Sequence, residues 1–358
     1  MQLSIDWYSV VMKHTWSISR GSWDEETIYK VTLMQDGVSG IGECCTVERY
    51  GESDEVIVAS FEAAREVFAG ADPWQYRALE KKLRRVIPSA PARAALEMAL
   101  LDWIGKTLDL PLYRFWGLSR EEIPLSSYSI GISSDEEIRE KLAEAAYDPI
   151  LKIKVGTDHD EDVLALIRKE TPRTLRLDAN EAWESVDEAL KNINKLARFG
   201  IEFIEQPMPA GDLDAVAELR RKSPIPIIAD EDCHTSADIP QLARAYDGIN
   251  IKLLKSGGLL EARRMIGLAH TFGLEVMLGC MLETSVGIAA AAHIAPAVEY
   301  IDLDSHRLLA EEPYQPIRME HGKIKLTERP GLGISPAGRR KSSSRKVAWP
   351  GKGVSASL

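Results

Sequence analysis

The chain has 358 residues, with 44 Lys and Arg against 55 Asp and Glu, so its formal net charge is −11 with neutral histidines. An acidic chain of this balance is not expected to bind nucleic acid as its main partner. No run of about 18 uncharged apolar residues and no signal-peptide pattern is present, so we expect a cytoplasmic protein that does not bind membranes. The length predicts about two domains. The four scattered cysteines are expected to be buried thiols.

The first part of the chain changes from a strand pattern to a helix pattern. Apolar and polar side chains alternate at 28–33, and Gly37 and Gly40 give turn signals, which indicates antiparallel strands up to about residue 55. Residues 53–118 are rich in Ala and Leu with helical periodicity. We therefore predict an α+β capping domain at residues 1–120, with a contribution from residues 310–335.

After Pro124, short β-branched runs alternate with amphipathic helices, a pattern typical of a parallel sheet. The expected strands are 125–130, 150–155, 174–178, 201–205, 225–230, 248–253, 274–278 and 300–304. Eight such units predict a closed α/β barrel of the TIM type, placed at residues 121–309. A doubly wound sheet would need a Gly-rich phosphate turn after its first strand, and the sequence has none there. Residues 336–358 are predicted to be a disordered basic tail.

Five successive strands of this repeat end in an ionisable residue. These residues are Lys154, Asp178, Glu205, Asp230 and Lys252, and the intervals between them are 24, 27, 25 and 22 residues. One charged residue after a strand is ordinarily a solvated loop residue or a helix cap, but five in phase indicate a shared site. Catalytic residues of such barrels collect at the carboxyl ends of the strands.

Three of the five residues are carboxylates on adjacent strands, Asp178, Glu205 and Asp230. Converging oxygen ligands without His or Cys favour one Mg²⁺ over zinc. Their mutual repulsion also calls for a cation. The sequence therefore predicts a magnesium site at the mouth of the barrel.

Two lysines bracket these carboxylates in strand order, Lys154 before them and Lys252 after them. Next to a divalent cation the pKa of each lysine is expected to be lowered, so each could act as a base. Two bases on opposite faces of a carbon would exchange its α-proton and invert the centre, through an enediolate that the metal stabilises. The alternative is that the lysines and carboxylates form only an ion network.

At these residues the chain resembles the enolase superfamily, specifically its muconate-lactonising subgroup, over residues 3–335. The motifs are KIK at 152–154, LDANEAW at 177–183, IEQP at 204–207, ADED at 229–232 and INIKLLKSGG at 249–258. The resemblance implies an α+β capping domain and a modified TIM barrel, (β/α)₇β. It also implies assembly into homo-oligomers.

The same resemblance assigns roles to the motif residues. Lys154 and Lys252 would be the acid/base pair, and Lys152 would support Lys154 and the substrate. Asp178, Glu205 and Asp230 would bind the metal. Asn180 and Glu231 would support these ligands from beside them.

Substrate choice depends on motifs that are similar to those of dipeptide epimerases. Asp302 and Asp304 resemble the acidic pair that binds the α-ammonium group of a dipeptide, and paired carboxylates without a metal favour a cation. ISRGS, with Arg20, and CCTVERYGES, with Arg49 and Tyr50, resemble the cap loops of L-Ala-D/L-Glu epimerases. Either arginine could receive a glutamyl side chain. The alternative is that these residues are surface charges.

Two positions depart from that pattern. Glu283 stands after LGCML, and Ser305, His306 and Arg307 follow the acidic pair where a glycine is usual. Glu283 is expected either to orient Lys252 or to contact the ammonium group. His306 and Arg307 are expected to alter which second residue is accepted.

The sequence thus predicts an isomerase, a Mg²⁺-dependent dipeptide epimerase that inverts the C-terminal residue of a small dipeptide. The favoured reaction is L-Ala-L-Glu to L-Ala-D-Glu, used in murein peptide metabolism. The alternatives within the subgroup are an N-acylamino acid racemase, an o-succinylbenzoate synthase and a muconate cycloisomerase. A non-catalytic binding protein on the same barrel is the alternative of another class.

Overall fold

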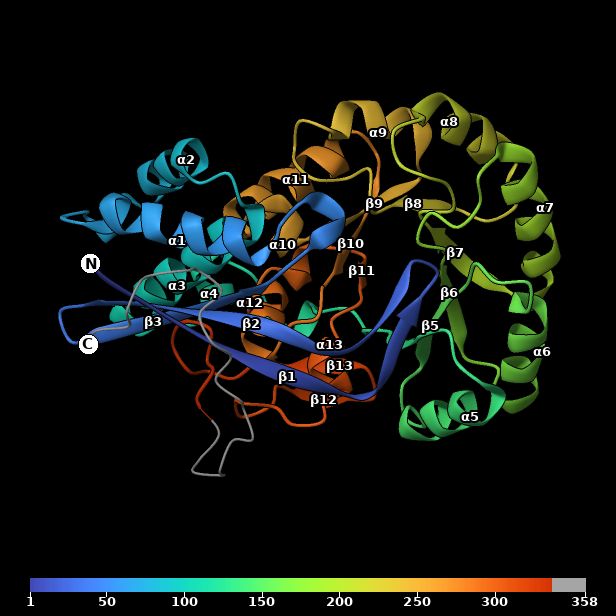
Figure 1. Cartoon of the computed structure of the whole chain (residues 1–358), viewed down its shortest axis with the longest axis horizontal. Coiled ribbons are helices and arrows are strands. Elements are labelled where there is room, and N and C mark those ends of the chain that lie inside the picture. Colours follow the sequence, from blue (N-terminus) through green and yellow to red (C-terminus); the bar gives the residue numbers. More distant parts are fainter. Residues whose placement is uncertain (337–358) are drawn as a thin grey trace.

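The structure is a computed structural model that describes residues 1–336. Figure 1 shows a cap built from the first part of the chain beside a ring of parallel strands, with helices outside the ring. The predicted basic tail, apart from its first residue, lies outside the described residues.

The cap is an antiparallel sheet with helices on it, as the sequence predicts. Its strands pair in the order β1-β2-β3, and they are followed by helices. The bounds are β1 Gln2–Ile18, β2 Gly21–Gln35, β3 Val38–Cys45, α1 Asp54–Phe68, α2 Tyr76–Val86, α3 Ala90–Thr107 and α4 Leu112–Phe115. The β1–β2 hairpin is long enough to leave the cap and reach the barrel, where it lies near β5 and β6 (Figure 1).

Helix α3 packs directly on strand β3. Ser89 caps the helix by accepting a hydrogen bond from the backbone N–H of Ala92 at 3.2 Å, and Pro91 follows in the first turn. A Cβ at Gly42 would fall on the carbonyl oxygen of Ala95, so only glycine lets the two backbones approach this closely. The cap sheet and α3 therefore form one packed layer pair.

The barrel has eight parallel strands in sequential order, β4 to β11. Their bounds are β4 Tyr128–Ile130, β5 Ile150–Lys154, β6 Thr174–Asp178, β7 Ile201–Glu205, β8 Ile227–Ala229, β9 Gly248–Lys252, β10 Glu275–Gly279 and β11 Tyr300–Ile301. A parallel bridge between Ser126 and Ile301 joins the last strand to the segment before the first one. The ring is closed at this point.

Each of the first seven barrel strands is followed by a helix, which confirms the (β/α)₇β arrangement. The bounds are α5 Asp135–Glu144, α6 Asp160–Glu170, α7 Val186–Leu196, α8 Leu213–Lys222, α9 Ile239–Ala245, α10 Leu253–Ser256, α11 Leu259–Thr271, α12 Ser285–Ala292 and α13 Ser305–Leu308. Helices α5 to α9 cover the outside of the ring (Figure 1). A hairpin of β12 Arg318–Glu320 and β13 Lys323–Lys325 follows α13.

Five barrel strands are shorter than predicted, namely β4, β5, β8, β9 and β11. Strand β8 begins at Ile227 because Pro226 has no N–H to donate to the ladder. Strand β11 ends at Ile301, although Asp302 still donates its N–H to the carbonyl of Leu278 at 2.8 Å. The next N–H, of Leu303, donates to a serine hydroxyl instead.

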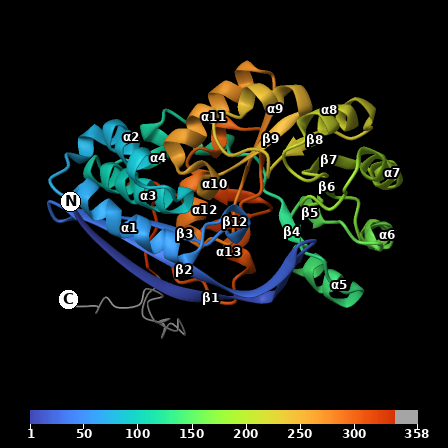
Figure 2. The same ribbon diagram turned by 45° about the horizontal axis from the view of Figure 1, so that its top comes forward.

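The chain after the barrel returns to the cap. Leu309 bridges to Met12 of β1, and Gly331 bridges to Pro111 beside α4. Figure 2 shows the orange and red segments near the end of the described chain next to the cap strands. The contribution of 310–335 to the cap is consistent with these contacts, and the exact domain boundaries stay a prediction.

Two buried carboxylates of the cap bind the N-terminal ends of barrel helices. Glu43 of β3 accepts hydrogen bonds from the backbone N–H groups of Thr284 at 2.8 Å and Gly287 at 2.9 Å, at the start of α12. Glu97 of α3 accepts one from Leu260 at 2.8 Å, at the start of α11. The first backbone N–H groups of a helix have no partner within the helix and need other acceptors, so these contacts fix the cap on the barrel.

Among the helices in residues 1–336, none has the length and apolar character that crossing a membrane requires. All four cysteines lie in this part and are free. Cys44, Cys45 and Cys233 are buried as predicted, whereas Cys280 is only partly buried.

Candidate active site

The strand ends of the barrel bring the predicted ionisable residues to one mouth. Side chains of a strand alternate between its two faces, so Lys152 and Lys154 share the inner face of β5. Asp178 ends β6 and Glu205 ends β7, and the two are paired in register. Asp230 follows β8, and Lys252 ends β9.

The three carboxylates of Asp178, Glu205 and Asp230 form one cluster. One oxygen of each lies within 4.8 Å of the others, and all three side chains are buried. Buried carboxylates repel one another unless cations lie among them. Three hard oxygen donors at this spacing suit a magnesium ion, so the residues fit the predicted metal.

Lysines set the ionisation of two of these carboxylates. Burial is the largest influence on Asp178 and opposes its charge, yet the ammonium groups of Lys154 and Lys152 hold its pKa below the ordinary value. Burial opposes the charge of Asp230 too, and Lys252 is the main group that holds its pKa well below the ordinary value. Both carboxylates are therefore charged and ready to bind a cation.

Lys152 lies at the centre of the cluster. Its Nζ is 2.7 Å from Oε2 of Glu205, 2.8 Å from Oδ2 of Asp302 and 3.1 Å from Oδ2 of Asp178. Burial alone would lower the pKa of Lys152, but the three carboxylates, Asp302 first, raise it well above the ordinary value. A permanently charged lysine here holds the carboxylates together, which is consistent with a supporting position.

Lys154 and Lys252 lie on opposite sides of the carboxylate cluster. Lys154 Nζ is 2.6 Å from Oδ2 of Asp178, and Lys252 Nζ is 2.7 Å from Oδ2 of Asp230. The indole of Trp16, at the end of the cap hairpin, lies 5.9 Å from Lys154 Nζ. Burial alone would lower the pKa of Lys252, but the carboxylates of Asp230 and Glu205 together raise it above the ordinary value. The sequence analysis expected lowered pKa values for these lysines, and that expectation depends on a divalent cation beside them.

The structure adds side chains that the sequence analysis missed. Lys255 donates to Oδ1 of Asp230 at 2.5 Å, and Asn250 donates to Oε1 of Glu205 at 2.7 Å. Asn250 is two residues before Lys252, so period-two alternation along β9 could have indicated that it faces inward. Gln206 accepts from the backbone N–H of Asp230 at 2.9 Å.

Asn180 and Glu231 lie beside the carboxylate cluster. The backbone N–H of Asn180 donates to Oδ1 of Asp178 at 3.0 Å, and the residue has a φ of 45°. Its amide lies 3.4 Å from Oε1 of Glu231, whose pKa burial and Asp230 raise to about 7. These contacts fit the supporting position that the sequence predicts for both residues.

Asp302 and Asp304 follow β11 on the inner side of the barrel, and both are buried. Asp302 Oδ1 accepts from the hydroxyls of Ser127 at 2.6 Å and Ser129 at 3.0 Å. Asp304 Oδ2 accepts from the backbone N–H of Ser129 at 2.6 Å. Burial and the charge of Asp302 raise the pKa of Asp304 to about 7, so a cation placed here would be stabilised by this pair.

Glu283 and Arg307, which depart from the epimerase pattern, lie in surroundings that differ from each other. Glu283 is buried, accepts from the backbone N–H of Met281 at 2.9 Å, and has a pKa that burial raises to about 7. Arg307 binds Asp148 through both guanidinium nitrogens at 2.8 Å and stacks over Tyr128, so it points away from the mouth. The expectation that Arg307 selects the second residue is therefore not supported by its position.

The two cap loops reach the mouth. We define the first cap loop as 19–20, between β1 and β2, and the second as 46–53, between β3 and α1. Arg20 NH2 lies 2.8 Å from Oε1 of Glu231, and Arg49 binds Glu181. Tyr50 is partly buried, and burial together with the charge of Asp230 raises its pKa. The structure thus brings all three cap-loop residues to the site that the sequence predicts.

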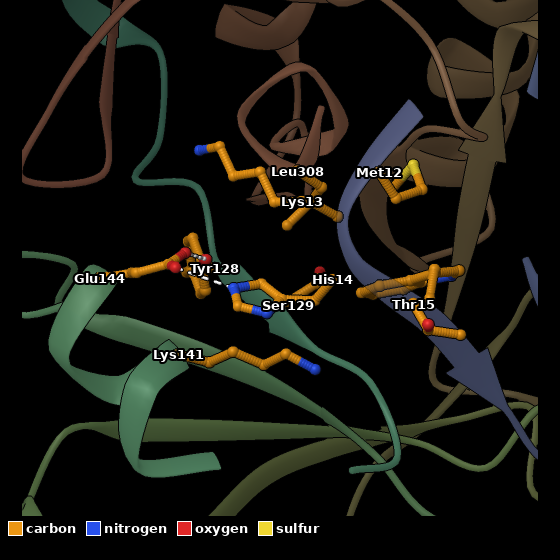
Figure 3. Close-up of a pocket in the computed structure, with 10 residues that line it drawn as sticks. Met12, Lys13, His14, Thr15, Tyr128, Ser129, Lys141, Glu144 and Leu308 are labelled. Atoms are coloured by element: carbon orange, nitrogen blue, oxygen red, sulfur yellow. Dashed lines mark hydrogen bonds and ion pairs between the residues drawn. The ribbon is translucent and has the colours of Figure 1, made fainter. Parts of the chain in front are cut away.

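A recess lies beside the barrel wall, and Trp16, which contacts Lys154, is one of its lining residues. It lies between β1 and α5, and Tyr128 and His14 point into it toward Glu144 (Figure 3). Glu144 lies 2.8 Å from His14 Nε2 and accepts from the Tyr128 hydroxyl at 3.0 Å. Ser129 also lines the recess, and its hydroxyl donates to Asp302 at 3.0 Å, so β4 contributes to both the recess and the mouth.

A capped (β/α)₇β barrel with three carboxylates between two lysines at its mouth defines an enzyme of the enolase superfamily. The N-terminal domain model of mandelate racemase/muconate lactonizing enzymes matches residues 6–117, and the enolase C-terminal domain-like model matches residues 135–340. The chain belongs to the mandelate racemase/muconate lactonizing enzyme family, as the resemblance implied.

Named relatives match over almost the whole chain. The L-Ala-D/L-Glu epimerase of Bacteroides thetaiotaomicron is 35% identical, over 93% of this chain and 88% of that one. The L-Ala-D/L-amino acid epimerase of Maribacter sp. is 37% identical, over 94% of this chain and 99% of that one. The dipeptide epimerase from Cytophaga hutchinsonii, solved with Mg and D-Ala-L-Val, has a TM-score of 0.89 at 28% identity and covers 97% and 99% of the two chains.

Proposed function

We propose that the protein is a Mg²⁺-dependent dipeptide epimerase that inverts the α-carbon of the C-terminal residue. The observation that carries the proposal is the position of Lys154 and Lys252 on opposite sides of the carboxylate cluster. The similarity to named dipeptide epimerases over more than nine-tenths of the chain supports it.

In this proposal Asp178, Glu205 and Asp230 would hold one Mg²⁺, whose charge would attract the substrate carboxylate. The ion would stabilise the second negative charge that this carboxylate acquires when the α-proton leaves. Lys152, Lys255 and Asn250 keep the three ligands in place through the contacts described above.

Lys154 and Lys252 carry the proton transfer. The neutral amine of one lysine takes the α-proton. The electron pair of the broken C–H bond then moves onto the substrate carboxylate. The other ammonium group then donates a proton to the opposite face of the planar carbon. Removal from one face and return to the other inverts the configuration.

Asp302 and Asp304 are proposed to bind the α-ammonium group at the other end of the dipeptide. The two carboxylates are buried and repel each other, so a positively charged group such as the substrate ammonium is favoured beside them. N-acylamino acid racemases, o-succinylbenzoate synthases and muconate cycloisomerases act on substrates without a free ammonium group. The buried acidic pair therefore favours a dipeptide over the substrates of these relatives.

The two relatives described above are named for dipeptides that begin with L-Ala, and this supports L-Ala at the first position. Glu is the C-terminal residue of one relative's substrate, whereas the other relative is named for amino acids in general. The conversion of L-Ala-L-Glu to L-Ala-D-Glu in murein peptide metabolism stays a prediction. Glu283, Tyr50, Arg20 and Arg49 are the side chains proposed to shape that choice.

We further propose that the protein works in the cytoplasm as a homo-oligomer, on small molecules and without nucleic acid or membrane as a partner. The acidic net charge supports the lack of a nucleic acid partner. Free cysteines agree with a reducing compartment.

The proposed function is tested by proton exchange in D₂O. The protein is incubated with Mg²⁺ and a panel of L-Ala-L-X dipeptides, among them L-Ala-L-Glu, and the C-terminal α-proton is followed by NMR. We expect the signal to be lost while the second epimer accumulates. Absence of exchange over the whole panel would contradict the proposal.

A further inference from the structure

Glu181 occupies an unusual position in the loop after β6. It has a φ of 67°, in the left-handed region that few non-glycine residues adopt. Only 7% of its side chain is exposed, although it lies outside the carboxylate cluster. Oε1 accepts a hydrogen bond from the backbone N–H of Ala210 at 2.9 Å, so the carboxylate is also fixed to the loop after β7.

The first cap loop binds to this carboxylate. Arg20 NH1 lies 3.0 Å from Oε2 of Glu181 and donates to the carbonyl of Asn180 at 2.7 Å. Ser19 donates to the same carbonyl at 3.1 Å. The tip of the β1–β2 hairpin is therefore attached to the loop that carries Glu181.

The second cap loop binds to the same side chain. Arg49 donates from Nε to Oε2 of Glu181 at 3.0 Å and from NH2 to Oε1 at 2.8 Å. This is the bidentate geometry that a guanidinium group adopts with a carboxylate. A substrate carboxylate would need the same two donors.

Both guanidinium groups of this corner are paired without a substrate. Arg20 faces Glu181 and Glu231, and Arg49 faces Glu181. Two carboxylates thus meet two guanidinium groups. An acidic substrate side chain would find no unpaired positive charge here unless it displaced Glu181.

We propose that Glu181 is a positioning residue that holds both cap loops on the barrel mouth, and that by occupying Arg20 and Arg49 it favours dipeptides with a neutral C-terminal side chain over acidic ones. The proposal depends on the proposed epimerase function. It departs from the expectation that these arginines receive a glutamyl side chain.

The first test compares two substrates. In the wild-type protein we expect a higher kcat/KM for L-Ala-L-Met than for L-Ala-L-Glu. E181Q removes the competing charge and is expected to shift this ratio toward L-Ala-L-Glu by about tenfold, mainly through KM. E181D keeps the charge and is expected to keep the wild-type preference. A loss of structure would lower both rates together and leave the ratio unchanged.

E184Q is the matched control. Glu184 is in the same loop and loses the same charge, but its side chain is exposed. We expect its ratio to stay within about twofold of the wild-type value. A ratio that does not shift in E181Q, or that shifts equally in E184Q, would overturn the proposed preference.

The second test needs no substrate. Trypsin cleaves after arginines that are free to enter its pocket, so the bonds after Arg20 and Arg49 report on the two cap loops. We expect E181Q to be cut at both bonds several-fold faster than the wild-type protein and E184Q, as measured by mass spectrometry. Equal cleavage in all three proteins would overturn the role of Glu181 in holding the loops. If the protein exchanges no dipeptide α-proton, the proposed epimerase function is contradicted. The trypsin result still tests whether Glu181 holds the two cap loops.

Discussion

Lys255 binds one oxygen of the Asp230 carboxylate, with its Nζ 2.5 Å from Oδ1, while Lys252 contacts the other oxygen, Oδ2. Nζ also donates to the backbone carbonyl of Asp230 and to that of Asn250 at 3.2 Å. Both lysine and carboxylate are buried. The carboxylate is thus fixed on one oxygen while its other oxygen stays on the side of Lys252.

K255M is therefore expected to weaken Mg²⁺ binding by about 10- to 100-fold, because partners that orient a metal ligand contribute about this much to affinity. The Mg²⁺ concentration that gives half-maximal epimerisation should rise accordingly, with kcat at saturating Mg²⁺ reduced less. An exposed lysine on α7 offers the control K191M, which should keep the wild-type value. Wild-type Mg²⁺ dependence in K255M would show that Lys255 does not position Asp230.

K154A and K252A are each expected to lower the rate of epimerisation by about 10²- to 10⁴-fold, since each removes one proton-transfer group. The remaining lysine can still exchange the α-proton on its own face. Each variant should therefore incorporate deuterium into only one of the two epimers, and the epimer should differ between the variants. NMR in D₂O with both epimers measures this, and normal epimerisation by either variant would contradict the two-base mechanism.

D304N is expected to raise KM for dipeptides by about tenfold, because it removes one charge that faces the substrate ammonium group. The asparagine carbonyl can still accept from Ser129, so the fold should be retained. N-acetylated dipeptides have no ammonium group and are the internal control. The wild-type protein should reject them more strongly than D304N does. An equal KM change for free and acetylated dipeptides would argue against an ammonium site.

The buried Glu97 predicts a pH-dependent stability. Burial raises its pKa from 4.5 to about 8 in the folded protein, so between these values the folded state binds a proton that the unfolded state has lost. The contribution of this bound proton to the free energy of unfolding is therefore complete below pH 4.5 and is lost as the pH rises through about 8. The free energy of unfolding falls by up to about 1.4 kcal/mol per pH unit in this range. E97Q removes this contribution and keeps a carbonyl acceptor for Leu260.

Urea unfolding at pH 5, 6.5 and 8 checks this prediction. The stability of E97Q relative to the wild-type protein should increase with pH. E66Q, at an exposed position on α1, should show no such trend. A constant difference between E97Q and the wild-type protein would mean that Glu97 titrates at its ordinary value.

The barrel and its carboxylate cluster could be predicted because each depends on local repetition. Strands recur at nearly constant spacing, and the charged residue at each strand end follows the same rhythm, so Asp178, Glu205 and Asp230 had to meet at one mouth. The positions of the strand ends could be predicted less well, because they depend on individual backbone groups. Pro226, for example, has no N–H to donate.

Glu181 and Lys255 could not be predicted in the same way. Glu181 acts on arginines that are 161 and 132 residues away in the sequence, and nothing in its own segment indicates that two cap loops meet there. Lys255 lies on a short helix after β9, and only the turn at the strand end aims it back at Asp230. Such contacts depend on how separate loops approach in space.

The return of the chain to the cap has a consequence for synthesis on the ribosome. Asp102, buried in α3, accepts a hydrogen bond at 2.7 Å from the N–H of Leu332, 230 residues later. At about 5 to 20 residues per second, roughly 10 to 50 s pass between the two residues. During that time the cap helix carries a buried carboxylate without one of its partners, so the cap cannot reach its final packing before the barrel has been made.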